Sequence, residues 1–258
     1  MSFSEVQLLQ DQLHARTSEF QNRVADTHNF IDFVLSQTKE PEVSCSFGKD
    51  SVVMLHLILQ HRPDIPVYSF SNKQYDFPDT HRLRWELQEK WDLNLILVER
   101  NVSRAVETED EGGAYNRLFF AVLKEQVKKH SWDCAFVGKR KEEAPRRKRE
   151  IDKKGIFFPD AINGKIAYPL ADWTVNDIWA YHTINDLSHH EIYEKQNCGL
   201  TRDTIRLGIM FDPLFDRTGE QVWMKKNYPE LYNIHLPVHA KIKEKRITAR
   251  GQGEASQL

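Results

Sequence analysis

Cysteine is scarce in this chain of 258 residues. The three cysteines, Cys45, Cys134 and Cys198, lie far apart, and no two of them have the two-residue spacing that is typical of zinc or iron–sulfur ligands. We therefore expect neither a zinc ion nor an iron–sulfur cluster. The same scarcity favours a reducing, cytoplasmic location.

Long hydrophobic runs are also lacking. The longest, Val52–Leu59, is interrupted by His56 and is too short to span a bilayer. The first residues do not show the basic stretch, apolar core and cleavage site of a signal peptide. The sequence therefore predicts a protein with no membrane partner.

An excess of either charge is lacking as well. The chain has 36 Lys and Arg against 38 Asp and Glu, which gives a net charge of −2. Such a balance gives no global attraction to nucleic acid or to an anionic membrane. One segment departs from it, because residues 139–154 contain nine Lys or Arg and four Asp or Glu, an excess of five. This segment is either a solvated surface or a nucleic-acid contact.

The chain does contain a strand, a tight turn and a helix in close succession. In residues 43–47 apolar side chains alternate with small or polar ones, which is typical of a strand. Residues 52–59 are apolar on nearly every face, which predicts a buried helix. Between them, Gly48 lets backbone N–H groups close on a ligand, and Lys49 adds a positive charge. We expect a phosphate-binding turn at residues 46–51.

This alternation of strands and helices continues along the chain. Apolar runs at 65–70, 93–98 and 134–137 indicate further strands, and helices are expected from about Asp79 and over 115–129. The pattern predicts an α/β fold with a parallel, twisted sheet and helices on both faces. Ligands bind such sheets at the carboxyl ends of the strands, where the turn at 46–51 lies.

We divide the chain into four segments. They are an N-terminal helical segment (1–40), a nucleotide-binding α/β domain (41–213), a small C-terminal helical appendage (214–250) and a disordered tail (251–258). In the first segment, helical from Ser4 to about Val34, the apolar residues Leu9, Leu13, Phe20 and Val24 recur at helical spacing. This helix either covers a face of the sheet or makes a homodimer contact. Residues 107–113 form an acidic loop, either a solvated loop or a mobile lid.

Three motifs resemble a known superfamily. Ser46–Ser51, with the letters SFGKDS, resembles the PP-loop of ATP pyrophosphatases. Gly138–Arg147 resembles the G-x-R-x-x-E-x-x-x-R element of the branch that contains phosphoadenosine phosphosulfate reductases and the small subunit of sulfate adenylyltransferase. Tyr168–Trp179 is similar to that branch's P-L-x-x-W-T-x-x-D-V-W block. Together the motifs cover roughly residues 42–213.

The resemblance implies an adenine nucleotide alpha-hydrolase-like, Rossmann-like fold and a set of site residues. ATP and Mg²⁺ are the expected cofactors, with cleavage or transfer at the α-phosphorus and release of pyrophosphate. Lys49, Arg140 and Arg147 would neutralise the charge that develops on the leaving group. The implied nucleotide-binding residues are Ser46, Phe47, Gly48, Lys49, Asp50, Ser51, Gly138, Arg140, Glu143 and Arg147. Asp50 would face Mg²⁺ through the phosphates, or would only stabilise the first turn of its helix.

The chain also departs from the family pattern at three places. Ser71–Lys73 stands where many relatives have an Asp-Thr-Gly-like turn, which leaves adenosine contacts there open. Arg206–Pro213 has isoleucine and aspartate where some relatives have two cysteines, which disfavours a cluster. Asn197–Leu200 lacks the Glu and His of the reductase tail, and no cysteine follows Cys198. We interpret Cys198 as a structural or incidental thiol.

Two further groups of residues have structural explanations. Thr174 and Asp177 form a capping box that begins a helix. His189 and His190 followed by Glu191 suggest a metal site, but adjacent residues face different ways and no third ligand is suitably spaced. We therefore expect no metal at this position.

Several functional hypotheses remain open. In the first, the protein is an enzyme that binds ATP through the PP-loop and adenylates an unidentified acceptor. In the second, it is a phosphoadenosine phosphosulfate reductase-like protein that binds or acts on a sulfonucleotide. In the third, it is a nucleotide-binding regulator or nucleic-acid-associated protein that makes its contact through the basic segment.

Overall fold

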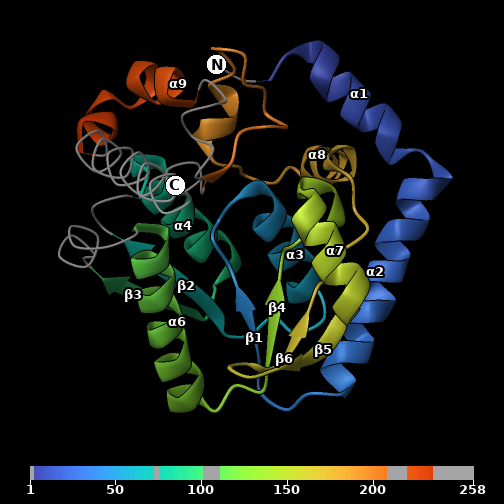
Figure 1. Ribbon diagram of the computed structural model, residues 1–258. Helices are drawn as coiled ribbons and strands as arrows, with labels where there is room; N and C mark the ends of the chain where they lie inside the picture. The colour runs from blue at the N-terminus through green and yellow to red at the C-terminus, as the bar shows by residue number, and fades with distance from the viewer. Residues whose placement is uncertain (1–2, 73–75, 101–110, 208–219, 235–258) are drawn as a thin grey trace, which may run out of the picture.

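A six-stranded sheet forms the centre of the molecule (Figure 1). The computed structural model describes residues 3–72, 76–100, 111–207 and 220–234. The strands are β1 (Pro41–Ser44), β2 (Val67–Asn72), β3 (Leu95–Arg100), β4 (Cys134–Val137), β5 (Phe157–Asp160) and β6 (Gly164–Ala167). Their order is β3-β2-β1-β4-β6-β5, and all neighbours are parallel except β5 and β6. The predicted parallel α/β sheet is confirmed, whereas the antiparallel β5–β6 pair was not predicted.

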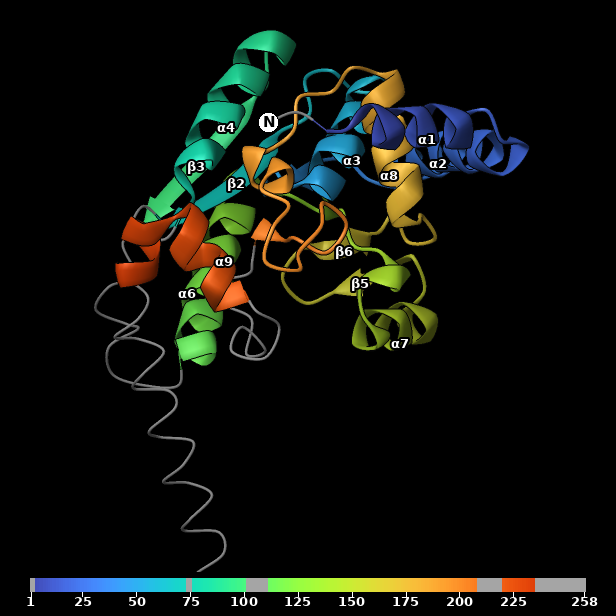
Figure 2. The ribbon, with the colours of Figure 1, turned by 90° about the horizontal axis from the view of Figure 1, so that it is seen from above.

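Helices cover both faces of this sheet, as predicted (Figures 1 and 2). They are α1 (Glu5–Ala15), α2 (Ser18–Ser36), α3 (Lys49–Leu59), α4 (Pro78–Trp91), α6 (Glu111–His130), α7 (Pro145–Lys154), α8 (Val175–Ile184) and α9 (Glu220–Asn227), with 3-10 turns at Lys141–Glu143 and Glu191–Glu194. Apolar residues of α2, α3, α4 and α8 share one core with the sheet, and α6 packs on the other face. In the described part of the chain, no helix is both long and apolar enough to cross a membrane.

Helix α3 lies in the main core and is nearly surrounded by apolar contacts. Six of its side chains are fully buried, namely Val52, Val53, Met54, Leu55, Leu57 and Ile58. Burial of one such side chain contributes about 1.5–3 kcal/mol to folding. The helix is therefore fixed firmly along its length, and this fixes the position of the loop that precedes it.

The N-terminal segment differs from the single helix that the sequence predicts. It breaks at Arg16, and the hydroxyl of Thr17 accepts a hydrogen bond from the Phe20 N–H to begin α2. Helix α2 packs on the core, but α1 packs on α8. Consequently Leu9 and Leu13, whose spacing suggested a buried face, are 56% and 54% exposed.

The C-terminal appendage is described only in part. Trp223 and Met224 of α9 are buried in a second core together with Phe77, Trp179 and Tyr193. Helix α9 therefore packs directly on the predicted nucleotide-binding domain. The predicted tail at 251–258 and most of the acidic loop at 107–113 lie outside the described residues, although 111–113 begin α6.

Strand β1 carries a fully buried carboxyl group, Glu42. The Ser44 hydroxyl donates to its Oε1 atom at 2.8 Å, and its Oε2 atom has no partner among the described residues. Burial raises the pKa of Glu42 from an ordinary 4.5 to about 8. The folded protein thus keeps this carboxyl group protonated at neutral pH.

This buried acid makes stability depend on pH. Between about pH 5 and pH 8 the unfolded chain releases the Glu42 proton and the folded chain keeps it, so rising pH favours unfolding by up to about 1.4 kcal/mol per pH unit. Glu42→Gln removes the titration and keeps an acceptor for Ser44. We expect the variant to gain stability relative to the original protein from pH 5 to pH 8, measured by urea unfolding. A stability difference that stays constant over this range would contradict the assignment.

Candidate functional site

The loop after β1 turns sharply into α3, and the residue that makes the turn is not the expected glycine. Phe47 has a φ of 59°, in the left-handed region, whereas Gly48 has an ordinary φ of −76°. A left-handed residue other than glycine costs roughly 1–2 kcal/mol. Packing compensates for this cost, because the Phe47 ring is fully buried and the Arg84 guanidinium carbon lies 5.6 Å from its centre.

The two motif glycines are needed for close approach instead. A Cβ atom on Gly48 would lie 3.3 Å from the Tyr193 hydroxyl oxygen and 3.3 Å from the Leu207 side chain. A Cβ atom on Gly138 would lie 3.3 Å from the backbone of Ser51. Gly138 follows β4 directly, so its lack of a side chain lets the end of β4 contact the first turn of α3.

Three charged side chains converge on the start of α3. The Lys49 ammonium lies 3.2 Å from one carboxylate oxygen of Asp50, and the Arg140 Nε atom lies 2.5 Å from the other. Lys49 and Arg140 are 4% and 3% exposed. Burial acts to raise the pKa of Asp50, but the two cations outweigh it and hold that pKa below its ordinary value. We call Lys49, Asp50 and Arg140 the charged triad.

The charged triad bears on the predicted role of Asp50 toward Mg²⁺. Each oxygen of its carboxylate already faces one cation, so direct coordination of a metal ion would require breaking an ion pair. The geometry fits Asp50 as the counter-ion of Lys49 and Arg140. A Mg²⁺ ion that arrived with a nucleotide would be held by the phosphates, as this ion commonly is.

The amino end of α3 lies beside the charged triad. Gly48 is its N-cap and supplies no side-chain hydrogen bond. The Ser51 hydroxyl donates to the Gly48 carbonyl at 3.0 Å and lies 3.2 Å from the Ser46 hydroxyl. The backbone N–H groups of a helix start and its dipole both favour an anion. A phosphate or a sulfate at this end of α3 would therefore meet these N–H groups and the Lys49 ammonium, while the Arg140 guanidinium is shared between Asp50 and Glu142.

The second motif supplies Arg140 directly and Arg147 indirectly. The Arg140 backbone N–H donates to Glu143 Oε2 at 2.9 Å, and its side chain donates to Glu142 at 2.6 Å and to the Trp173 carbonyl at 3.3 Å. Arg147 pairs with Glu143 and is 38% exposed. The structure therefore brings Arg140 to the loop, whereas Arg147 reaches the site only through Glu143. Of the two arginines predicted for the site, Arg140 contacts the loop and Arg147 pairs with Glu143.

Two residues that the sequence did not reveal also hold the loop. His182 lies 2.9 Å through Nε2 from the Lys49 carbonyl, and the Tyr193 hydroxyl accepts from the Lys49 N–H at 3.1 Å. Burial lowers the pKa of His182 to about 4, so the ring is neutral and donates from Nε2. Both residues lie more than 130 positions from Lys49, but a polar His182 inside the apolar helix α8 was a usable signal.

The described cysteines differ sharply in their surroundings. Burial raises the pKa of Cys45 to about 11 and that of Cys134 to about 12, so both remain thiols at neutral pH. Cys45 lies next to the loop, with its sulfur 3.9 Å from the Ser51 carbonyl. Cys198 is exposed. Of the three, only Cys198 is both accessible and outside the hydrophobic core.

The other residues that the sequence singled out, His189, His190 and Ser71, have ordinary hydrogen-bond partners. The buried ring of His190 lies 2.9 Å from the Thr80 hydroxyl, and His189 lies 3.2 Å from Glu194. The described ranges contain no group of three His, Cys, Asp or Glu residues that could hold a metal ion. The Ser71 hydroxyl donates to the Asp76 carboxylate at 2.6 Å. Of the segments that differ from the family pattern, residues 73 and 208–213 lie outside the described residues.

The basic segment at 139–154 is largely neutralised within the protein. Ion pairs join Lys139 to Glu150, Lys141 to Asp172, Lys148 to Asp152 and Lys154 to Glu150, in addition to those of Arg140 and Arg147. Internal pairing leaves less charge for nucleic-acid phosphates than the residue count suggests.

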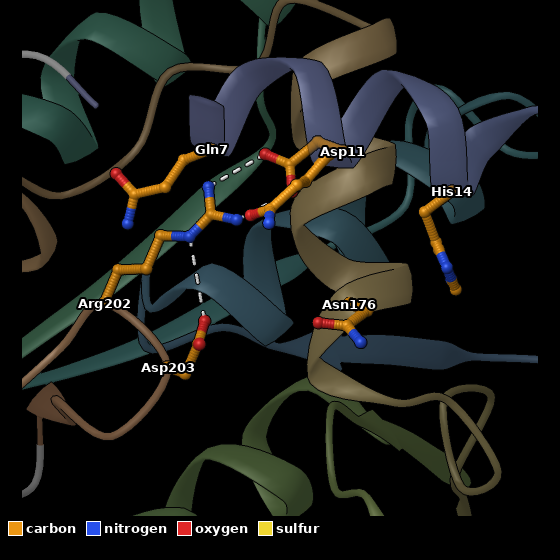
Figure 3. A pocket seen from close by; sticks show the side chains of 7 residues that line it. Gln7, Asp11, His14, Asn176, Arg202 and Asp203 are labelled. Atoms are coloured by element: carbon orange, nitrogen blue, oxygen red, sulfur yellow. Dashed lines mark hydrogen bonds and ion pairs between the residues drawn. The ribbon is translucent and has the colours of Figure 1, made fainter. Parts of the chain in front are cut away.

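A separate polar cavity of about 340 Å³ lies between α1, the start of α8 and the segment that contains Arg202 (Figure 3). The Arg202 guanidinium reaches Asp11 on α1 through two hydrogen bonds of 2.8 and 2.7 Å and lies 3.7 Å from Asp203. Two carboxylates thus face one guanidinium. Asp11 and Asp203 therefore offset the positive charge that Arg202 brings to this cavity.

Comparison with known proteins points to one family. The residue pattern of the phosphoadenosine phosphosulfate reductase domain matches residues 40–232. The phosphoadenosine 5′-phosphosulfate reductase of Xanthomonas euvesicatoria pv. vesicatoria is 31% identical over 169 residues, covering 59% of this chain and 66% of that protein. The protein of the same name from Alteromonas mediterranea is 31% identical over 169 residues, covering 59% and 64%. The matched region thus spans slightly less than two thirds of these relatives.

Solved structures share the fold. Phosphoadenylyl-sulfate reductase from Candida auris, in a phosphate complex, aligns with a TM-score of 0.52 at 14% identity, over 75% of this chain and 93% of that one. The U34-tRNA thiolase NcsA from Methanococcus maripaludis aligns with a TM-score of 0.53 at 13% identity, over 87% and 80%. These similarities establish the fold alone and confirm the predicted adenine nucleotide alpha-hydrolase-like architecture.

The charged triad predicts how a single substitution would act. Asp50→Asn removes the carboxylate that Lys49 and Arg140 share and leaves Arg140 with Glu142, which should destabilise the protein by about 3–5 kcal/mol in chloride buffer because the buried Lys49 loses its partner. Inorganic phosphate should then restore stability in the variant more than it stabilises the original protein, because an anion replaces the missing charge. Urea unfolding with and without phosphate measures both effects.

A matched control is Asp152→Asn. Its carboxylate pairs with Lys148 and Lys141 at the surface and is 45% exposed. Removing it should leave stability nearly unchanged, with no added response to phosphate, because solvent screens a surface ion pair. Equal stability of Asp50→Asn and the original protein in chloride would show that the triad is not an important electrostatic unit.

Proposed function

Because the chain belongs to the phosphoadenosine phosphosulfate reductase domain family, we propose that it binds a sulfonucleotide, an adenosine 5′-phosphosulfate with or without a 3′-phosphate. The observation that carries this proposal is the charged triad at the amino end of α3. Family membership favours this alternative over the ATP-dependent adenylation that the sequence suggested first. It also favours an enzyme over a regulator.

The geometry suits the phosphosulfate group of such a ligand. Backbone N–H groups at the start of α3 would hold the phosphate, while Lys49 and Arg140 would exchange part of their contact with Asp50 for ligand oxygens. A guanidinium matches two oxygens at once, so Arg140 would fix the orientation of the bound group. Glu142 and Glu143 hold Arg140 in place for this role.

Reduction of such a ligand requires a thiolate nucleophile, and the chain offers few. Cys45 and Cys134 are buried and protonated, and Cys198 is the accessible thiol. A thiol supplied by another molecule would be the reductant if the protein releases sulfite. In that case the protein would differ from an enzyme whose own cysteine attacks the sulfonucleotide.

The burial of the Cys45 and Cys134 thiols also supports a second candidate function, adenylyl transfer from ATP. In that reaction an acceptor oxygen attacks the α-phosphorus and pyrophosphate leaves, so no protein nucleophile is needed. Lys49 and Arg140 would then neutralise the negative charge that develops on the pyrophosphate. Mg²⁺ bound to the nucleotide phosphates would share this task.

Binding and product measurements separate the two candidates. We expect adenosine 5′-phosphosulfate to bind more tightly than ATP with Mg²⁺ in calorimetry, and to yield sulfite when an external thiol is added. Lys49→Ala should weaken binding of either ligand by about 30-fold or more, since it removes a charge-assisted contact of about 2 kcal/mol. Tighter binding of ATP, with pyrophosphate release, would favour the second candidate.

The control for Lys49→Ala is Lys148→Ala. Lys148 is a surface lysine of α7, 63% exposed, and it pairs with Asp152 away from the loop. The Lys148→Ala variant should bind adenosine 5′-phosphosulfate and ATP as tightly as the original protein does. If Lys49→Ala binds both nucleotides as tightly as the original protein does, the loop is not the phosphate site and the proposal fails.

A further inference from the structure

The hydroxyl group of Tyr193 lies beside the predicted phosphate-binding loop at residues 46–51, next to the first residue of α3. This tyrosine comes from the 3-10 turn Glu191–Glu194, far along the chain from the loop. Its oxygen accepts from the Lys49 N–H at 3.1 Å and lies 3.3 Å from the position of a Cβ atom on Gly48. The hydroxyl thus occupies the place where a helix start would meet a bound anion.

The ring of Tyr193 is held firmly in this position. It is 2% exposed, and it meets the Trp179 ring edge-on with centroids 5.3 Å apart. The Lys49 ammonium lies 5.4 Å from the ring centroid. The aromatic contacts and the hydrogen bond together fix both the ring and its oxygen, so the hydroxyl is pre-positioned before any ligand arrives.

The hydroxyl hydrogen of Tyr193 has no acceptor among the described residues. A tyrosine hydroxyl can donate one hydrogen bond and accept others, and the Lys49 N–H uses only an accepting position. Burial, with the added effect of Asp50, raises the pKa of Tyr193, so the group keeps its hydrogen at neutral pH. A buried donor without an acceptor is costly, and a ligand oxygen would satisfy it.

We propose that Tyr193 is a ligand-binding residue whose hydroxyl donates its hydrogen to a non-bridging oxygen of the nucleotide's 5′-phosphate while accepting from the Lys49 N–H. The proposal rests on the proposed function for the identity of the nucleotide. It adds a neutral donor to the charged triad. A neutral donor recognises an oxygen atom without increasing the positive charge of the site.

The competing explanation is that the hydroxyl only takes the position that a phosphate oxygen would occupy in the loop. Under that explanation a ligand must displace it, and its removal would free the Lys49 N–H for the phosphate. The two explanations predict effects of opposite sign. Removing the hydroxyl weakens binding if it donates to the ligand and strengthens binding if it competes with the ligand.

The deciding variant is Tyr193→Phe, which keeps the ring and removes only the hydroxyl group. We expect its affinity for adenosine 5′-phosphosulfate to fall about tenfold or more in calorimetry, since one hydrogen bond to a charged group is lost. Affinity for adenosine, which has no phosphate, should not change. Unchanged or tighter binding of adenosine 5′-phosphosulfate would overturn the proposal.

Tyr181→Phe is the matched control. Tyr181 is also buried, and its hydroxyl lies 3.0 Å from His56 and 3.1 Å from Gln60, near the opposite end of α3. The same change of tyrosine to phenylalanine there should leave nucleotide affinity intact. A loss in this control equal to that of Tyr193→Phe would assign the effect to general loosening of the core and overturn the proposal.

Inorganic phosphate provides a second probe that separates this proposal from the proposed function. If the original protein does not bind adenosine 5′-phosphosulfate, the proposed nucleotide is wrong, but the hydroxyl can still be tested. Phosphate should raise the melting temperature of the original protein more than that of Tyr193→Phe. Equal increases in both proteins would overturn the role of the hydroxyl whichever nucleotide binds.

Discussion

The contact between the first turn of α3 and the end of β4 is the constraint on which the site depends. Asp50 on the helix and Arg140 after the strand form a buried ion pair, and Gly138 lets the two backbones meet. A buried ion pair gives limited net stability but strongly penalises any arrangement that separates its partners. The pair therefore acts mainly to fix relative position. Lys49, Glu142 and Glu143 take their places around it.

The sequence was sufficient for the parts of this arrangement that depend on local pattern. The strand–helix alternation predicted the parallel sheet and its helices, and the SFGKDS motif predicted the position of the loop. The capping box of Thr174 and Asp177 begins α8 as expected. Local patterns succeed here because strand, helix start and buried helix each bring their own spacing of apolar and polar residues.

What the sequence could not predict depends on contacts between distant segments. The left-handed Phe47 is tolerated because its ring is buried and Arg84 lies against it, which no local spacing reveals. The exposure of Leu9 and Leu13 follows from the packing of α1 on α8, because their spacing alone looked like that of a buried helix face. The β5–β6 hairpin was missed although Asn163–Gly164 is a common turn signal.

The ion pair between Asp11 and Arg202 has a consequence for how the chain acquires its structure. Its partners are 191 positions apart, so α1 is made early but cannot form this contact until most of the protein has left the ribosome. Contacts of such long sequence separation form late and slow the last steps of folding. During that interval Asp11 lacks the guanidinium that ties α1 to the segment around Arg202, so this first helix gains its full set of contacts late.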